Sequence, residues 1–344
     1  MIPVTGGHLQ PITAGLFFTC AVNAEGGVEC WGQNDLGQLG NGTNEDSNTP
    51  VIVIGPEGEG KLSSPVKADG PQGVVDLSAG LNHTCALESN GDVWCWGLND
   101  EGQLGNGTNE DSNVSVQVPI SGAIDITSGP DYSCAVLSSG EVKCWGANDK
   151  GQLNDGTRNS SNLPVTSLIY GVRDISAGQG MLCGLDPAGN VKCWSGGEEV
   201  DTSKLEGPMT FVIVSRFSNR VVALNADGDP VLWQAGGSGK LVKGASGGIY
   251  TDSGANDTCV IVTGGGTKCW GQNKFGGLGN GKKGPSDTPV DVETLSSTYA
   301  IAVGQEHVCS MSGGEVMCWG YNSNGQLGNG SNEDSNVPVP VQGW

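Results

Sequence analysis

His83-Thr-Cys-Ala-Leu-Glu-Ser-Asn-Gly-Asp-Val-Trp-Cys-Trp-Gly97 is the stretch that decides the fold of this chain. It predicts two short strands around a tight turn, with one cysteine on each strand. Variants of the stretch recur near residues 18–32, 132–146, 181–194, 220–233, 257–271 and 307–320. Recurrence of one short unit along a whole chain is typical of repeat architectures. The sequence is therefore an array of seven copies of this hairpin.

The cysteines of each hairpin are expected to bond to each other. If Cys85 faces Cys95, the loop is residues 89–91 and ends on Gly91, where a three-residue hairpin needs a left-handed residue. The last copy is one residue shorter, which leaves Gly313-Gly314 as a two-residue turn. The fifth copy has lost both cysteines together, since Val222 and Leu232 replace them. Six disulfides are predicted: Cys20–Cys30, Cys85–Cys95, Cys134–Cys144, Cys183–Cys193, Cys259–Cys269 and Cys309–Cys318.

Each full repeat contains four strand-like pieces, which in the second copy are residues 75–80, 83–88, 92–97 and 114–120. Four strands repeated seven times predict an all-β fold, a seven-bladed β-propeller of four-stranded antiparallel blades that takes up residues 1–344 as one domain. Residues 55–73, rich in Gly, Pro and Lys, are interpreted as a loop inserted between the first two blades. The outer strand of the seventh blade is expected at 337–342, with residues 2–5 as the competing segment.

Composition restricts the function. The net charge is −21 and only 16 residues are Lys or Arg, so nucleic acid is not an expected partner, because phosphate backbones need clustered cations. No apolar run approaches the ~20 residues of a membrane span. No leader is visible, but an even set of paired cysteines indicates an oxidising compartment, so we expect an extracellular, cell-surface or periplasmic protein. The three histidines form no arrangement with Ser, Cys or Asp that suggests catalysis, and we expect no enzymatic activity.

The pattern Ser-Ala-Gly-x-x-His-Thr-Cys-Ala-Leu, followed by Gly-x-Val-x-Cys-Trp-Gly-x-Asn-x-x-Gly-Gln-Leu-Gly-Asn-Gly-Thr, resembles the regulator of chromosome condensation repeat. The resemblance extends over nearly the whole chain and implies a seven-bladed propeller. The paired cysteines are similar to those of secreted bacterial members. The founding member of the family is a nuclear exchange factor that touches chromatin, and this acidic, cysteine-paired chain departs from it.

The turns between the first and second strands surround one end of the central channel and differ from blade to blade. Variation on a rigid scaffold is how a repeat protein carries a specific site, and exposed aromatic residues or methionine there would serve as anchors. The alternative is that the aromatics fill the channel and meet no partner. The predicted partner-binding residues are Phe17, Phe18, Asn82, His83, Asp131, Tyr132, Met181, Arg220, Asp257, Glu306 and His307.

A second set of loops, 34–48, 99–113 and 322–336, is nearly identical in three blades that become neighbours once the ring closes. Blades four and five lack this loop. The loops form an acidic arc on the same face, and they either bind calcium or are solvated turns whose Asn and Asp side chains bond their own backbone. No other cofactor is expected. The candidate calcium ligands are Glu45, Asp46, Glu110, Asp111, Glu333 and Asp334.

The function predicted from the sequence is that of a secreted or cell-surface binding module, which recognises a partner protein, with a basic surface, through its channel face. One alternative is a propeller-type enzyme inhibitor similar to the β-lactamase-inhibitor proteins. A second is a glycan-binding lectin, which would show one site repeated in several blades. A third is a structural component of a surface assembly.

Overall fold

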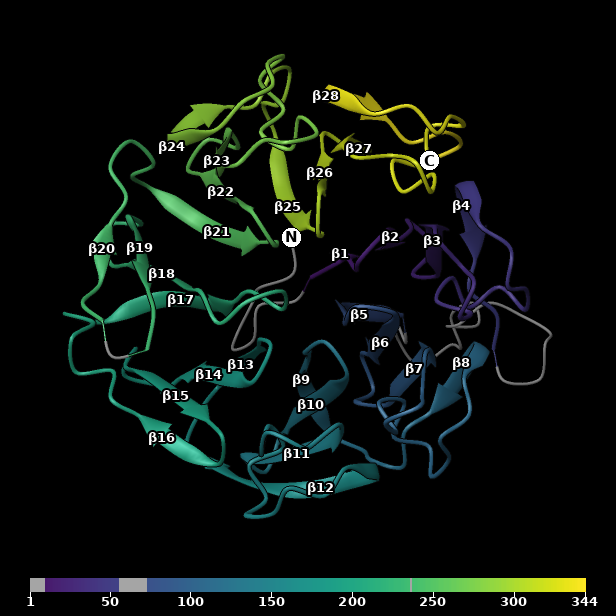
Figure 1. Cartoon of the computed structure of the whole chain (residues 1–344), viewed down its shortest axis with the longest axis vertical. Helices are drawn as coiled ribbons and strands as arrows, with labels where there is room; N and C mark the ends of the chain where they lie inside the picture. Colours follow the sequence, from purple (N-terminus) through teal and green to yellow (C-terminus); the bar gives the residue numbers. More distant parts are fainter. Residues whose placement is uncertain (1–9, 56–72, 236) are drawn as a thin grey trace.

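The computed structural model describes residues 10–55, 73–235 and 237–344, which form seven four-stranded antiparallel sheets. Figure 1 shows the sheets as blades of a ring, with one strand of each blade at the centre. The seven-bladed, all-β propeller predicted from the sequence is confirmed, and no helix occurs in the described ranges. The competing segment 2–5 and the inserted loop, apart from its two end residues, lie outside the described residues.

Strand order in each blade follows the chain from the inner strand to the outer one. Blade 1 consists of β1 (Ile12–Ala14), β2 (Phe18–Val22), β3 (Val28–Gly32) and β4 (Ser47–Ile52). Blade 2 consists of β5 (Val74–Ala79), β6 (His83–Glu88), β7 (Val93–Gly97) and β8 (Ser112–Gln117). Blade 3 consists of β9 (Ala123–Ser128), β10 (Tyr132–Leu137), β11 (Glu141–Gly146) and β12 (Ser161–Tyr170).

The remaining four blades repeat this order, although the outer strands of blades 4 and 5 are short. Blade 4 consists of β13 (Asp174–Ala177), β14 (Met181–Leu185), β15 (Val191–Ser195) and β16 (Glu198–Val200). Blade 5 consists of β17 (Met209–Val214), β18 (Val221–Asn225), β19 (Pro230–Trp233) and β20 (Lys240–Leu241). Blade 6 consists of β21 (Gly248–Ser253), β22 (Asp257–Val262), β23 (Thr267–Gly271) and β24 (Ser286–Asp291). Blade 7 consists of β25 (Thr298–Val303), β26 (His307–Ser312), β27 (Glu315–Gly320) and β28 (Ser335–Pro340).

The ring closes where blade 7 packs against blade 1. The C-terminal segment forms β28, which pairs with β27, so the expectation of an outer strand in this tail is confirmed. At the other end, β1 is the inner strand of blade 1 and packs against β5 on one side and β25 on the other. Within the described ranges, each blade is therefore built from one continuous segment of chain.

The central hairpin of each blade has the predicted register. Cys85 faces Cys95, Glu88 N donates to Asp92 O, and Gly91 has a φ of 87°. In the last hairpin, Ser312 faces Glu315 across Gly313 and Gly314, whose φ values are both positive, as a type I′ turn requires. All six predicted disulfides are present, with α-carbons 4.0–4.1 Å apart, and no free cysteine remains. Such short separations are typical of non-hydrogen-bonded cross-strand pairs.

Neighbouring blades are joined near the axis by side chains of the inner strands. Thr13 Oγ1 accepts a hydrogen bond from Ala79 N of the next blade, and Thr127 Oγ1 accepts one from Ala177 N in the same way. These polar side chains are almost fully buried, and each bond satisfies an inner-edge N–H that has no strand beside it. At these two junctions, side chains therefore link the inner edges of neighbouring blades without a continuous sheet.

Candidate functional site

One end of the central channel opens into a cavity of about 400 Å³. The turns between the first and second strands of all seven blades contribute to its wall. We call this set of residues the channel mouth, and it consists of Leu16, Leu81, Pro130, Gln179, Phe217, Ala255 and Gln305. Leu16 N donates to Leu81 O and Leu81 N to Pro130 O, so backbone bonds between blades fix this part of the wall. Five residue types occur at these seven positions, with leucine in blades 1 and 2 and glutamine in blades 4 and 7.

Exposure was predicted for four anchors in these turns, and it was wrong for three of them, since Phe18, Tyr132 and Met181 are buried and only Phe17 is partly exposed. Phe18, His83, Tyr132, Met181, His307 and Asp257 are at most 5% exposed. The physical reason is local packing, because the ring of Phe18 lies against the α-carbon of Gly15, where an added Cβ would lie 2.1 Å from the ring. His83, Tyr132 and His307 lie in the same way against the first glycine of their turns. These residues belong to the core.

The other predicted residues are half-buried on the mouth face: Phe17, Asn82, Asp131, Arg220 and Glu306. Phe17 joins an aromatic group that extends over three blades. Its ring centroid lies 5.7 Å from that of Tyr321, which in turn lies 4.7 Å from that of Phe275. Large, partly exposed aromatic side chains of this kind are the usual anchors of protein interfaces.

The two described histidines connect adjacent blades. His83 Nε2 lies 2.9 Å from Ser133 Oγ, and His307 Nε2 lies 2.9 Å from Thr19 Oγ1. Burial, together with the Arg216 charge, lowers the pKa of His83 to about 3, and burial lowers the pKa of His307 to about 3. Both rings are therefore neutral near pH 7 and have a structural role.

Arg216 lies between the channel and its mouth, and sequence reasoning missed it. Its side chain reaches from blade 5 across the axis, where a guanidinium N–H donates to Ala14 O in blade 1. Phe217 follows it in the mouth wall. A signal for both residues was available, because six residues lie between the paired Val214 and Val221, whereas four lie between Ala79 and Thr84, the corresponding pair in blade 2. The longer turn in blade 5 places an arginine and a phenylalanine over the channel.

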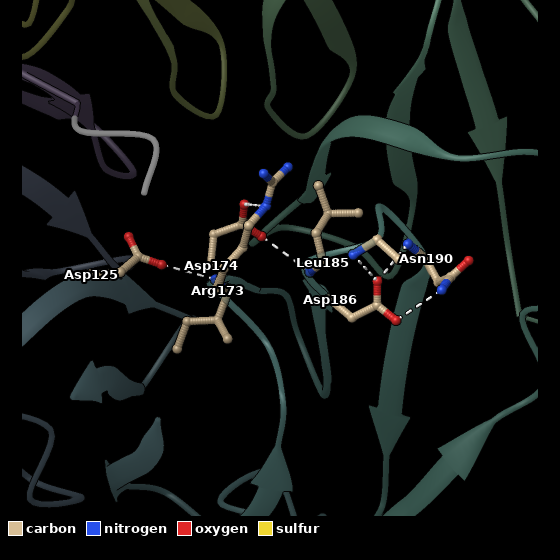
Figure 2. A network of polar contacts seen from close by, with 8 residues as sticks. Asp125, Arg173, Asp174, Leu185, Asp186 and Asn190 are labelled. Carbon is tan, nitrogen blue, oxygen red and sulfur yellow. Dashed lines mark hydrogen bonds and ion pairs between the residues drawn. The ribbon is translucent and has the colours of Figure 1, made fainter. Parts of the chain in front are cut away.

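Below Arg216 the channel contains a narrow cavity of about 50 Å³, lined by four aspartates. Figure 2 shows part of this region, where Asp125 Oδ2 accepts from Ile175 N and Asp174 Oδ1 accepts from Leu185 N. Asp76 accepts from Gln10 N, and Asp252 accepts from Val303 N. A space of this size holds a few water molecules, and the carboxylates that line it bond to backbone N–H groups of the inner strands.

Burial is the main cause of the shifted pKa values of these carboxyl groups. It raises the pKa of Asp76 to about 7. Burial and the neighbouring Asp76 charge raise the pKa of Asp125, and burial raises the pKa of Asp252 although Arg216 opposes this. At the mouth itself, burial followed by the charges of Asp100 and Glu101 raises the pKa of Asp131. On the side of the mouth formed by blades 2 and 3, carboxyl groups outnumber the one cation, Lys150, so cationic groups of a partner would be favoured there.

The predicted acidic arc is assembled in the ring. Asn48 Nδ2 of blade 1 donates to Asn332 Oδ1 of blade 7, and Asn113 Nδ2 of blade 2 donates to Asn44 Oδ1 of blade 1. Within each loop the aspartate accepts from a backbone N–H twelve residues earlier, as in the bond from Asn34 N to Asp46 Oδ1. Asp111 and Asp334 make the same bond.

In the described ranges, no three His, Cys, Asp or Glu side chains come together in a group fit for a metal ion. This geometry favours self-bonded turns over calcium loops. The calcium site remains a prediction.

No helix in the described ranges is long and apolar enough to cross a lipid bilayer.

Comparison with known families gives two matching patterns, both described as the regulator of chromosome condensation (RCC1) repeat. One matches residues 74–103, 123–152 and 299–326, and the other matches 25–87, 90–136, 269–311 and 313–343. Together they extend over 25–152 and 269–343, more than half of the chain. The unmatched part between them contains all of blades 4 and 5.

Curated proteins similar to this chain share only part of it. The human E3 ubiquitin-protein ligase HERC2 is 36% identical over 104 residues, which are 30% of this chain and 2% of HERC2. The ultraviolet-B receptor UVR8 of Arabidopsis thaliana is 33% identical over 110 residues, 32% of this chain and 22% of the receptor. The matched regions are therefore small parts of these longer proteins.

Among solved structures, Prp20p from Saccharomyces cerevisiae, studied for its binding to Gsp1p and histones, has a TM-score of 0.74 at 18% identity. The alignment covers 97% of this chain and 88% of that one. The yeast RCC1 (Prp20) structure bound to Kap60 has a TM-score of 0.76 at 17% identity and covers 99% of this chain and 90% of that one. At this identity the likeness shows the fold alone.

Proposed function

The chain belongs to the regulator of chromosome condensation (RCC1) repeat family, and from this premise we propose that it recognises a partner protein through the face that carries the channel mouth. Propellers of the family act as protein-interaction modules, and the yeast propeller of the same fold binds Gsp1p and histones. The observation that carries the proposal is the mouth itself, a cavity of about 400 Å³ to which every blade contributes a residue and in which five residue types occur on a rigid scaffold.

We propose a partner with a basic and partly aromatic contact surface. The support is chemical, since the three carboxylates Glu101, Asp131 and Asp149 outnumber the two cations Lys150 and Arg216 in the cavity lining, and the acidic arc extends the negative charge outward. Opposite charge on the partner would speed the encounter, and the group Phe17, Tyr321 and Phe275 would supply apolar contact area. The blade-to-blade variation of the mouth gives no support to a lectin, which would repeat one site around the ring.

We further propose that the protein works in an oxidising compartment, which is the extracellular space, the cell surface or a bacterial periplasm. The support is the face-to-face placement of all twelve cysteines in six pairs. Treatment with a thiol-alkylating reagent before reduction, followed by mass spectrometry of protein isolated from its native source, should find no modified cysteine. Alkylation of several cysteines would contradict this location.

The experiment for the binding face compares three forms of the full chain in capture of partners from the native milieu. One form is unchanged, and the second combines Phe17→Ala, Phe217→Ala and Asp131→Asn at the mouth. Phe18 and Tyr132 are left intact because they are core residues whose loss would destabilise the blade. The third is a matched control on the opposite face, where Ile124, Ile249 and Tyr299 are 39–56% exposed and are replaced by Ala.

We expect one protein to be retained by the unchanged chain and by the control form, and its affinity for the mouth form to fall at least about tenfold. Far-UV circular dichroism and melting temperature of the three forms check that they are equally folded. A protein that is bound equally by the mouth form, or is lost only from the control form, would contradict recognition through the channel mouth.

A further inference from the structure

Five blades carry a long loop that covers the tryptophan of the next blade in the ring. In blade 1, Gln38 O accepts a hydrogen bond from the indole Nε1 of Trp96, and Leu39 is fully buried beside this ring. Gly40 lies so close that a Cβ would be 2.9 Å from the indole. The loops of blades 2, 6 and 7 make the same bond, from Trp145 to Gln103 O, from Trp319 to Gly277 O and from Trp31 to Gln326 O.

We call the surface that receives such a loop, made of the blade tryptophan and the residues beside it, the loop seat. Blades 4 and 5 lack the long loop, as the sequence predicted, so the seats on blades 5 and 6 receive none. At the blade 5 seat the structure provides a substitute, because Trp233 Nε1 donates to Gly237 O of its own blade and the ring packs against Leu205. Among the residues that the structure describes, no such substitute is present at blade 6.

The blade 6 seat is instead an open cavity of about 300 Å³ between blades 5 and 6, which are neighbours in Figure 1. Trp270 and Leu232 line it, and Arg220, Thr258 and Lys240 are around them. Trp270 is 6% exposed, whereas Trp31, Trp96, Trp145 and Trp319 are completely buried. Within the described ranges no acceptor is bonded to the indole N–H of Trp270, which is also true of Trp194.

The seat of Trp194 differs from that of Trp270, because it is filled. Leu153 of the blade 3 loop packs against Trp194, but Asn154 stands where the other loops have glycine. Since a Cβ at that glycine would come within 3 Å of the indole in the other loops, Asn154 accounts for the missing bond. Trp270 therefore combines an indole donor without an acceptor and an open cavity.

We propose that the cavity at Trp270 binds a turn presented by a partner protein, with the chemistry of the loops that fill the other seats. The turn would offer a backbone carbonyl to the Trp270 N–H, a leucine side chain toward Leu232, and a glycine that lies flat on the indole. The filled seats of this chain show what the surface accepts. Charge supports the same occupant, because two cations, Arg220 and Lys240, and one carboxylate, Asp287, line the cavity, and the loop of blade 1 carries Glu45 and Asp46 after its turn.

The test uses the full chain labelled with ¹⁵N at its tryptophan indoles and a synthetic peptide with the sequence of residues 34–46. This peptide contains the groups that hold the loop together, since Asn34 Oδ1 accepts from Leu39 N and Asp46 Oδ1 accepts from Asn34 N. We expect the indole N–H signal of Trp270 to shift on titration, while those of Trp96 and Trp145, whose seats are filled, stay in place. Trp270→Phe assigns the signal and should abolish the response.

Two altered peptides give the test its specificity and leave the protein untouched. The peptide with Leu39→Ala should bind at least about tenfold more weakly, because it loses the burial of a leucine side chain. The peptide with Gly40→Ala should bind more weakly as well, because its Cβ meets the indole. A Trp270 signal that does not move up to the solubility limit of the peptide, or that moves equally with the Leu39→Ala peptide, would overturn the proposal.

Discussion

Blades 1, 2, 3, 6 and 7 and blades 4 and 5 are built from the same four strands, but they differ in what covers the junction to the next blade. In the first group a long loop places a buried leucine over the next tryptophan. In the second group the turn is short and the outer strand has two or three residues. Blade 4 has lost the loop but keeps its disulfide, whereas blade 5 has lost both. Stabilisation within a hairpin and stabilisation between blades are therefore independent properties of the repeat.

The largest expected effect on the free energy of unfolding comes from removing the buried leucine of a long loop, compared with removing a leucine beside the open cavity. Leu39→Ala should lower the free energy of unfolding by about 3 kcal/mol, because it leaves a cavity between the loop and Trp96. Leu232→Ala, at the half-buried edge of the open cavity in blade 5, should cost less than about 1 kcal/mol. Denaturant unfolding of both variants measures the difference. Equal costs would mean that the loop does not secure the junction between blades.

A somewhat smaller effect on stability is expected from exchanging the disulfide pair of the blade 6 hairpin with the Val222 and Leu232 pair of the blade 5 hairpin. The double variant Cys259→Val and Cys269→Leu gives blade 6 the pair found in blade 5, and it should cost about 2 kcal/mol through the lost constraint on the unfolded chain. The reverse change, Val222→Cys with Leu232→Cys, places two cysteines at directly paired positions and should be stabilising under oxidising conditions. Unfolding with and without a reductant measures both. If the reverse pair fails to close, the blade 5 hairpin is not equivalent to the others.

The inner strands give a third comparison, between Asp76, Asp125 and Asp174 in blades 2 to 4 and Phe211 and Tyr250 at the corresponding place in blades 5 and 6. Burial raises the pKa of Asp76 to about 7 from an ordinary value of 3.8. The folded protein thus binds more protons than the unfolded chain between these values, and its stability falls as the pH rises from about 4 to 7.

Replacing Asp76 by a residue that does not ionise should remove part of this loss of stability at higher pH. Asp76→Asn keeps an acceptor for Gln10 N and should raise the free energy of unfolding by about 1–2 kcal/mol at pH 8, with little change at pH 4. Unfolding curves at the two pH values measure this. A loss of stability at both would show that the carboxylate bonds outweigh the cost of burying the charge.

The sequence predicted the parts of this molecule that repeat. Blade number, hairpin register, the six disulfides and the absence of the long loop in blades 4 and 5 all follow from turn chemistry and spacing that recur. Side-chain direction at the channel mouth did not follow, because Phe18 and Tyr132 lie against a glycine of their own turn, a contact that residue type alone does not predict. Arg216 was missed because only the length of its turn differs, and the junction between blades became visible only when the loops were placed in the ring.

The smallest expected effect concerns calcium at the long loops of blades 1, 2 and 7. Asp46, Asp111 and Asp334 are each bonded to a backbone N–H of their own loop, and within the described ranges no carboxylate pair joins them in a metal-type group. Millimolar calcium should therefore raise the melting temperature by less than about 1 °C, since a cation with no preference for the folded state gives no stabilisation.

Substitutions of Asp46 distinguish its role as acceptor for a backbone N–H from a role as calcium ligand. Asp46→Asn retains a side-chain oxygen for Asn34 N and should melt like the unchanged chain, whereas Asp46→Ala loses this acceptor and should melt a few degrees lower, with or without calcium. A calcium-dependent rise of several degrees that disappears in Asp46→Asn would instead identify the acidic arc as a cation site. In that case ligand binding would distinguish blades 1, 2 and 7 from the other four, a division different from the one that loop packing makes.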